Sequence, residues 1–330
     1  KVSKNKKRKI LLFSDDLRMS SGVGTMSREI VMGTLDKFDW VQVGGAIKHP
    51  DSGKVVDMNE SVRKETGVKD ANLKIYPVDG YGSPEMLRYL MTAEKPDAIL
   101  HYTDPRFWEW LYQMEHEIRQ HIPIFYYNIW DDLPYPMWNE PFYESCDLIM
   151  NISKQTVNIV DNVCKDKPRT KTDNTYIPHG INSDNFYPID KKHKDWGDFL
   201  SFKRNATHNK DYDFIVFWNN RNIRRKLPGD VIMAYKTFCD MLPKEKSEKC
   251  LLIMHTAPRD ENGTDLPAVV EAMCSDYDVI FSTAKLNDKD LCYLYNVADV
   301  TINMASNEGF GLGTCESLMC GTPIIVNVTG

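Results

Sequence analysis

Short apolar runs alternate with longer amphipathic stretches from one end of the chain to the other. The first half contains the runs KILLFS, DWVQVGG, DAILHY, IPIFYYNIW and CDLIMNIS, and the second half contains DFIVFWN, CLLIMHT, YDVIFST, ADVTINM and TPIIVNV. Each run has the length of a β-strand, and the stretches between the runs are long enough for helices. This alternation predicts an α/β protein in which parallel sheets are covered by helices.

A polar segment interrupts the pattern between about Tyr187 and Lys210. It is rich in Lys and Asp and shows no strong period. The chain has 330 residues, which is enough for two domains. We therefore predict Rossmann-like domains at residues 1–188 and 211–330, joined by a linker region at 189–210.

Conspicuous polar motifs follow the ends of several predicted strands. These motifs are SDDLRMSSGVG and TDPRFW in the first half, and NNRNIRRK and SNEGFG in the second. Ligands of open α/β sheets bind outside the carboxyl ends of the strands. We therefore expect the motifs to line one cleft, across which the two parallel sheets face each other.

Two glycines, Gly22 and Gly24, separate the first strand from a helix in the motif SSGVGTMSREI. Glycines let a backbone approach a phosphate, and a helix N-terminus offers N–H donors to it. A plain tight turn explains the same residues about as well. A dinucleotide fingerprint would need a third glycine where Ser27 stands, so a site for NAD or FAD is disfavoured.

Two cations, Arg221 and Lys226, lie five positions apart in WNNRNIRRKLPGDVI. Such a run often forms a solvated face, but this one directly follows an apolar strand. A guanidinium and an ammonium at that place could clamp a diphosphate. Arg224 and Arg225 are expected to be surface or auxiliary residues.

Two glutamates, Glu308 and Glu316, flank a glycine turn in NEGFGLGTCESLMCGTPIIVNV. A helix is predicted over 311–318, ended by the Gly-Thr-Pro that follows. Carboxylates accept hydrogen bonds from vicinal hydroxyls. Two such acids around a phosphate-binding turn match hexose, pyrophosphate and ribose in that order, which describes a nucleotide-sugar.

As a set, these motifs resemble glycosyltransferase family 4, whose members have the GT-B fold and transfer sugar from nucleotide-sugars with retention. The glutamates match the family's E-x7-E motif, Arg221 and Lys226 match its diphosphate pair, and YIPHGINSDNFYP matches IPxGvDxxxFxP. SGVGTMSRE matches its first glycine loop. The similarity covers nearly the whole chain and is strongest from about Asp211 onward.

The resemblance implies a role for each matching residue. Glu308, Arg221 and Lys226 would be catalytic. The STAKL loop would lie beside the nucleobase. The residues that would bind the donor come from both domains and are Gly22, Gly24, Ser282, Lys285, Phe310, Gly311, Leu312 and Glu316. No DxD motif lies at a strand end, so the implied reaction uses neither a metal nor a cofactor besides the donor. No carboxylate is placed to act as a nucleophile.

The chain departs from the family pattern at three places. The family's HxH motif appears here as HYT, so that Thr103 replaces the second histidine, and His101 or Asp104 is left to contact the sugar. His101 could equally be a core histidine. The Ser-Pro before the E-x7-E motif is replaced by NMASN. The chain ends on the fifth strand of the second domain, so we predict that its C-terminal domain is incomplete.

The predicted acceptor domain is rich in aromatic residues, most of them expected in its core. Trp130 and Asp131 follow a strand end and could border an acceptor. A sugar, a glycan and another hydroxyl compound all fit, so the acceptor stays open. The nucleotide, the transferred sugar and the choice between hexose and pentose also stay open.

Composition limits the other possibilities. No apolar run reaches the roughly 18 residues of a membrane span. The eight cysteines form no CxxC pair, which favours reduced thiols and a cytoplasmic protein. The net charge is −6, although the first ten residues carry six Lys or Arg. The rest of the chain is therefore more acidic than the total suggests, which disfavours nucleic acid as a partner. The alternatives are a non-catalytic nucleotide-sugar-binding subunit and a GT-B epimerase or phosphorylase.

Overall fold

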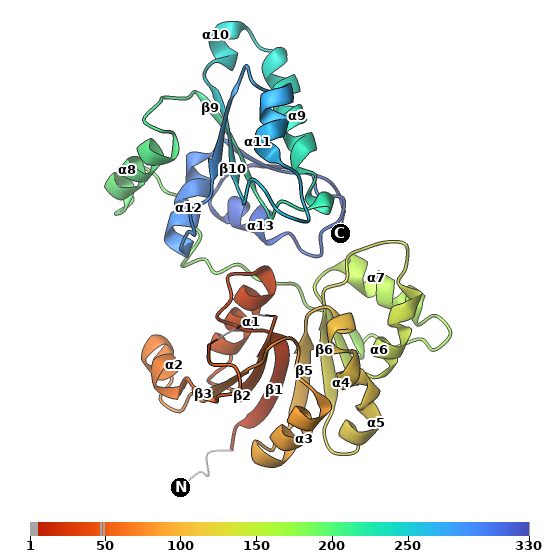
Figure 1. The fold of residues 1–330 in the computed structure, drawn as a ribbon. Helices are drawn as coiled ribbons and strands as arrows, with labels where there is room; N and C mark the ends of the chain where they lie inside the picture. Colours follow the sequence, from red (N-terminus) through yellow and green to blue (C-terminus); the bar gives the residue numbers. More distant parts are fainter. Residues whose placement is uncertain (1–5, 47, 49, 330) are drawn as a thin grey trace. The chain divides into compact units, whose positions relative to one another are not determined.

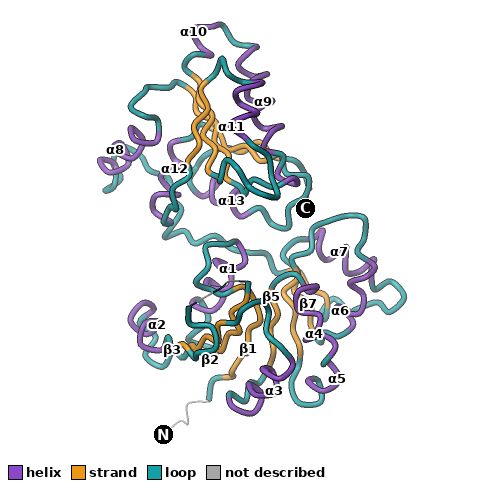
Figure 2. The backbone as a smooth tube through the Cα atoms, viewed as in Figure 1, coloured by secondary structure: helices purple, strands orange, loops and turns teal. Residues whose placement is uncertain are grey.

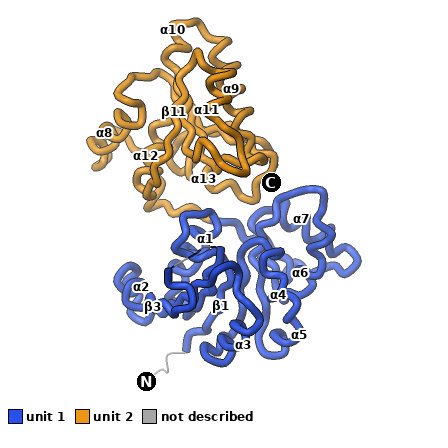
Figure 3. Tube along the Cα trace, in the orientation of Figure 1, with its two compact units in different colours: residues 1–179, 330 blue, residues 180–329 orange. Residues whose placement is uncertain are grey.

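The computed structural model describes residues 6–46, 48 and 50–329. The chain forms two compact units, the first ending at His179 and the second spanning Gly180–Thr329 (Figure 3). Each unit is built from strands and helices that alternate along the chain (Figure 2). The α/β class predicted from the apolar runs is confirmed.

Unit 1 contains, among its described residues, an eight-stranded sheet in the order β3-β4-β2-β1-β5-β6-β7-β8. Figure 1 labels β1, β2, β3, β5 and β6 of this sheet. All neighbours are parallel except β3, which pairs antiparallel with β4. The strands are β1 (Arg8–Asp15), β2 (Phe38–Gly45), β3 (Val56–Asp57), β4 (Leu73–Pro77), β5 (Ala98–Tyr102), β6 (Ile124–Asn128), β7 (Leu148–Asn151) and β8 (Asn174–Tyr176). The helices are α1 (Gly22–Met32), α2 (Asn59–Thr66), α3 (Pro84–Ala93), α4 (Glu109–Gln113), α5 (Glu115–Ile118), α6 (Glu140–Glu144) and α7 (Lys154–Val163), with 3-10 turns η1 (Pro105–Trp108) and η2 (Met137–Asn139).

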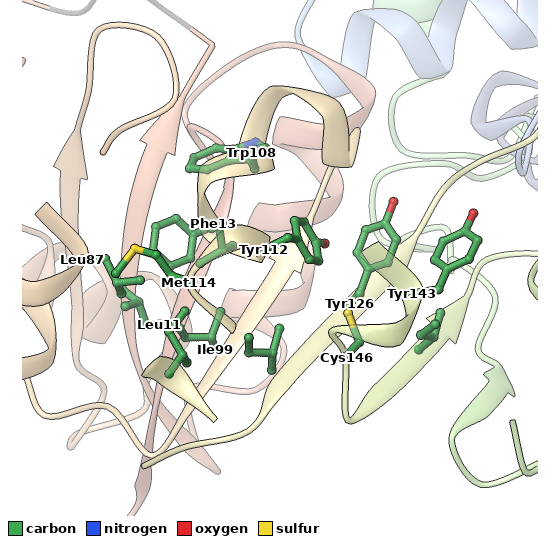
Figure 4. Close-up of a cluster of buried hydrophobic side chains, with 14 of the residues drawn as sticks. Leu11, Phe13, Leu87, Ile99, Trp108, Tyr112, Met114, Tyr126, Tyr143 and Cys146 are labelled. Carbon is green, nitrogen blue, oxygen red and sulfur yellow. The ribbon is translucent and has the colours of Figure 1, made fainter. Parts of the chain in front are cut away.

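The central strand β1 is buried on both faces. Its odd-numbered residues Leu11 and Phe13 pack with Leu87 of α3, Trp108 of η1 and Tyr112 of α4 (Figure 4). Its even-numbered side faces α1, because the buried Ser27 hydroxyl donates to Ser14 at 3.0 Å. Ser27 occupies the place of the missing third glycine, and it fastens α1 to the sheet.

Unit 2 contains a parallel five-stranded sheet, in the order β11-β10-β9-β12-β13 among its described residues. The strands are β9 (Phe214–Asn219), β10 (Cys250–His255), β11 (Asp278–Ser282), β12 (Val300–Asn303) and β13 (Ile324–Val326). The helices are α8 (Trp196–Ala206), α9 (Pro228–Asp240), α10 (Lys244–Ser247), α11 (Leu266–Met273), α12 (Asp288–Val297) and α13 (Leu312–Met319), with the 3-10 turn η3 (Arg224–Lys226).

Alternation along β9 explains the three layers of unit 2. Ile215 and Phe217 pack into the core formed with α8 and α12. Val216 and Trp218 pack into the core formed with α9 and α11. A strand with both faces covered appears in sequence as a continuous apolar run, as FIVFWN does.

The boundary between the units differs from the predicted one. The division falls after His179 rather than at 188. Residues 189–210 are not a linker, because they include α8, and Phe199 of that helix is buried with Phe186 in the core of unit 2. The backbone N–H of Ile189 donates to Asn296 of α12 at 2.8 Å, which attaches the segment further. Trp196, Phe199 and Leu200 do stand at helical spacing, but the many Lys and Asp residues around them led to the prediction of a linker.

All ten predicted strands are present, while β3, β4 and β8 were not predicted. In both sheets the strand order reverses beside the first strand, between β1 and β5 in unit 1 and between β9 and β12 in unit 2. Such a reversal is where α/β sheets bind ligands, at the carboxyl ends of the strands. None of the helices among the described residues is both long and apolar enough to cross a bilayer.

Candidate functional site

The predicted catalytic residues Lys226 and Glu308 meet at the reversal point of unit 2. Lys226 ends η3, just after β9, and Glu308 lies in the loop after β12. The Lys226 ammonium donates to Oε1 of Glu308, and Asn303 Nδ2 donates to the same oxygen at 3.1 Å. Lys226 is only 8% exposed and Glu308 is 19% exposed at its side chain. A buried cation and a half-buried carboxylate therefore form one fixed pair.

Arg225 adds a second cation to this pair. Its guanidinium donates to the carbonyl of Asn307 at 2.8 Å, and its Nη1 lies 3.7 Å from Oε2 of Glu308. Arg225 was expected to be a surface or auxiliary residue, and its partly exposed side chain fits the auxiliary role. Cations therefore flank Glu308 at both of its oxygens.

Arg221, the other predicted phosphate ligand, pairs with Asp260 of the loop after β10. Nε of Arg221 donates to Oδ2 at 2.9 Å and Nη2 donates to Oδ1 at 3.3 Å. The guanidinium lowers the pKa of the Asp260 carboxyl, chiefly through these hydrogen bonds. The arginine side chain is largely exposed, so it remains accessible to an anion.

The loop that carries Asp260 is fixed by the buried Asn222. Its Nδ2 donates to the carbonyl of Thr264 at 2.7 Å, and its Oδ1 accepts from the N–H of Thr264 at 3.1 Å. A Cβ on Gly263 would stand 2.2 Å from the Asn222 carbonyl oxygen, so only glycine allows this close approach. Asn222 therefore places Asp260 beside Arg221.

Helix α13 begins where it was predicted, after the glycine turn. Gly311 precedes it with a left-handed backbone (φ 78°), and no side chain in the described ranges caps the helix. Phe310 lies partly buried in the turn and Leu312 opens the helix. Free N–H groups and the positive end of the helix dipole suit an anion at this point.

Glu316 lies one turn into α13 and accepts a hydrogen bond from Tyr295 of α12 at 2.7 Å. The Tyr295 hydroxyl accepts in turn from Asn219 Nδ2, at the end of β9, at 2.9 Å. Burial raises the pKa of Glu316, and the hydrogen bond from Tyr295 opposes that shift. The second glutamate is thus held within the same group of elements as the first.

The predicted base loop follows β11. Ser282 ends that strand, and its hydroxyl lies 2.9 Å from Nδ1 of His255 at the end of β10. Burial lowers the pKa of His255, which favours the neutral ring. Lys285 is exposed in the loop. Thr256 directly follows β10, and its buried hydroxyl has no hydrogen-bond partner in the part of the chain that the structure describes.

In unit 1, Gly22 and Gly24 form the first turn of α1. The Ser21 hydroxyl caps this helix by accepting from the N–H of Gly24 at 3.0 Å. A Cβ on Gly24 would stand 2.6 Å from the Met19 carbonyl oxygen, so close packing explains this glycine. Asp15 lies beside the cap. Burial raises the pKa of its carboxyl, and hydrogen bonds from Ser21 and Thr103 partly offset that rise.

His101 is a core residue, which argues against its predicted contact with a sugar. The ring is fully buried, is stacked on Tyr126 at 5.2 Å between centroids, and lies 2.6 Å from the Tyr112 hydroxyl through Nδ1. Burial lowers its pKa to about 3. Strand alternation decides this outcome, because His101 faces the same core as Ile99. Thr103 is also buried.

The other possible acceptor contacts lie on the surface of unit 1. Asp104 caps η1 and binds Arg106, whose guanidinium lies 4.9 Å from the centroid of the Trp130 ring. Asp131 is partly buried next to Trp130. Trp138 stands edge-on to Trp130 at 6.2 Å and is 58% exposed. These side chains form an aromatic and acidic surface.

Several residues of the unit 2 site were not predicted: Asn219, Asn222, Asp260, Tyr295 and Asn303. Asn219 and Asn303 each end a strand, so strand-end position was a usable signal for them. Tyr295 is in a helix, and its sequence context resembles that of any core tyrosine. No group of three or more His, Cys, Asp or Glu that could hold a metal was found across residues 6–46, 48 and 50–329.

Comparison with known proteins identifies the fold. No protein-family model and no curated protein matches the chain. Among solved structures, Anabaena HepE in complex with UDP-glucose is 14% identical, with a TM-score of 0.69 over 98% of this chain and 81% of that one. Sucrose-phosphate synthase from Thermosynechococcus elongatus is 16% identical, with a TM-score of 0.66 over 98% and 82%. A Rickettsia africae glycosyltransferase is 14% identical, with a TM-score of 0.63 over 98% and 80%. The chain has the GT-B fold, with two Rossmann-like units, as predicted.

Proposed function

We propose that this protein is a glycosyltransferase that moves a sugar from a nucleoside-diphosphate-sugar to a hydroxyl-bearing acceptor. The observation that carries the proposal is the pairing of Lys226 with Glu308 beside β9 and β12, where the strand order of unit 2 reverses. Glu316 follows in the helix that starts after the same loop. The likeness to HepE supports UDP-glucose as the first donor to test.

The diphosphate would bind to Lys226, Arg221 and the N-terminus of α13. Breaking the anomeric C–O bond leaves negative charge on the phosphate oxygen and positive character on the sugar. Fixed cations and helix N–H groups stabilise such a leaving group without reorganising during the reaction. The Lys226 ammonium donates directly to the Glu308 carboxylate. This contact supports a phosphate on Lys226 and a sugar on Glu308, bound side by side.

The two glutamates would bind the two ends of the donor. Glu308 would accept hydrogen bonds from hydroxyls of the transferred sugar, next to the Lys226 cation. Glu316, one turn into α13, would accept hydrogen bonds from the ribose. The loop with Ser282 and Lys285, after β11, would lie beside the base.

The finer features of the reaction rest on the family resemblance. They are retention of configuration, independence of metal ions, the donor contacts of Gly22 and Gly24, and an acceptor near Trp130 and Asp131. The aromatic and acidic surface of unit 1 supports a carbohydrate acceptor, because ring faces and carboxylates suit sugar C–H and O–H groups.

The test combines binding with turnover. A thermal-shift panel of UDP, GDP and ADP should give stabilisation by one or more of them, and labelled UDP-glucose or a related donor should be hydrolysed or transferred. Stabilisation without any turnover would favour a non-catalytic nucleotide-sugar-binding subunit. Stabilisation by none of the three nucleotides would reject the proposal.

A further inference from the structure

The Tyr295 hydroxyl connects three elements around the predicted ribose contact. It donates to Oε2 of Glu316 at 2.7 Å and accepts from Asn219 Nδ2 at 2.9 Å. The direction of each bond is determined, because a carboxylate can only accept and an amide nitrogen can only donate. Tyr295 is fully buried, so its hydroxyl is shielded from bulk solvent.

The first turn of α13 closes over this network. A Cβ on Gly313 would stand 3.0 Å from the Tyr295 hydroxyl oxygen and 3.6 Å from the Asn219 carbonyl oxygen. A glycine here lets the helix approach the network without displacing it. The Asn219–Tyr295–Glu316 chain therefore lies directly below the helix N-terminus that the diphosphate would contact.

A second tyrosine of α12 shows that burial alone does not require a hydrogen-bonded hydroxyl. Tyr293 is 3% exposed, and within the described residues its hydroxyl makes no hydrogen bond of good geometry, although the Lys289 ammonium lies 5.5 Å from the centroid of its ring. Tyr295, two positions later, directs its hydroxyl at the carboxylate of Glu316. The contrast points to a specific task for the hydroxyl at position 295.

We propose that Tyr295 is a positioning residue, which fixes one oxygen of Glu316 and thereby presents the other oxygen to the ribose hydroxyls of the donor. The inference rests on the proposed function, since it assigns Glu316 to the ribose. Only Oε2 of Glu316 is bonded to Tyr295, and Oε1 makes no hydrogen bond to the residues that the structure describes. Without the tyrosine hydroxyl, the carboxylate can rotate, and binding must restrict it again.

The decisive comparison is between Tyr295→Phe and its matched control Tyr293→Phe. Each variant loses one buried hydroxyl from the same helix and keeps its ring. We expect Tyr295→Phe to weaken UDP binding about fivefold, as the loss of one hydrogen bond would. Pyrophosphate binding should be unchanged, because pyrophosphate has no ribose. Tyr293→Phe should alter neither affinity.

A second readout separates positioning from a loss of stability. Wild-type protein should bind UDP more tightly than 2′-deoxy-UDP. The ratio of these two affinities should be smaller in Tyr295→Phe. Equal UDP affinity in wild type and Tyr295→Phe, or an equal loss of UDP and pyrophosphate binding, would overturn the inference about Tyr295. Either result would leave the proposed function standing. Absence of binding of UDP, GDP and ADP to the wild type would instead reject the proposed function and the inference with it.

Discussion

Asp260 holds Arg221 by two parallel hydrogen bonds, of 2.9 Å and 3.3 Å. The Asp260 carboxylate accepts from two N–H groups of Arg221 that a diphosphate would also use. Its negative charge also repels the phosphate groups. We expect Asp260→Asn to tighten nucleoside diphosphate binding by a few-fold, since ion pairs near the surface are weak. Isothermal titration calorimetry measures this. Weaker binding would show instead that Asp260 orients Arg221 for the ligand.

Arg221 and Arg224 offer a matched pair of cations on one segment. Only Arg221 is predicted to touch phosphate, and Arg224 is exposed. Arg221→Ala should weaken nucleoside diphosphate binding by about 1.5–3 kcal/mol, the scale of a charge-assisted hydrogen bond. Arg224→Ala should leave the affinity within experimental error. Equal losses in both variants would indicate a general effect of positive charge.

Glu308 should matter for turnover more than for nucleotide binding. Glu308→Gln keeps the shape of the side chain and removes the charge that faces Lys226. Because its proposed partners belong to the transferred sugar, UDP affinity should stay nearly constant while kcat falls. Melting temperature and kcat are measured together. A destabilised variant with full activity would show that Glu308 is a structural partner of Lys226.

Glu316 should lower the stability of the ligand-free protein at neutral pH. Burial raises its pKa, so the folded state holds the proton more tightly than the unfolded chain does. The free energy of unfolding therefore falls as the pH rises from the ordinary carboxyl pKa to the raised one. Glu316→Gln removes this cost, and its gain in melting temperature over wild type should be larger at about pH 7.5 than at about pH 4.

A binding measurement completes the test of Glu316. The same variant should bind UDP more weakly, because the amide replaces the carboxylate that we propose to contact the ribose. Burial raises the pKa of the neighbouring Cys315 thiol, and the hydrogen bond with Cys292 together with burial raises that of Cys320, so neither thiol loses its proton in this range. Each melting curve is compared with the wild type at the same pH. A gain in stability that does not depend on pH would contradict the assignment to the buried charge.

Asn222 should be important for stability although it is polar. It is fully buried, and it satisfies both the N–H and the carbonyl of Thr264. Asn222→Ala should cost about 2–4 kcal/mol of unfolding free energy, because it leaves buried backbone groups unpaired. Asn262→Ala, an exposed change in the same loop, should cost less than about 0.5 kcal/mol. Chemical denaturation of both variants tests the contrast.

The local pattern of the chain determined its elements and much of its site chemistry. Runs such as FIVFWN predict a strand buried on both faces, and β9 is such a strand. The glycine turn after Glu308 predicts a helix start, and α13 begins there. These features depend on neighbours along the chain, whose side-chain periods of about 2 and 3.6 residues are visible in one sequence.

The tertiary structure alone decided which of these residues meet. Lys226 and Glu308 are 82 positions apart, and they touch because β12 pairs with β9 rather than with β11. Tyr295 reaches Glu316 for a similar reason, because α12 and α13 pack side by side although these two residues are 21 positions apart. Strand order and the direction of each side chain follow from packing the whole unit at once, and no local period encodes such long-range contacts.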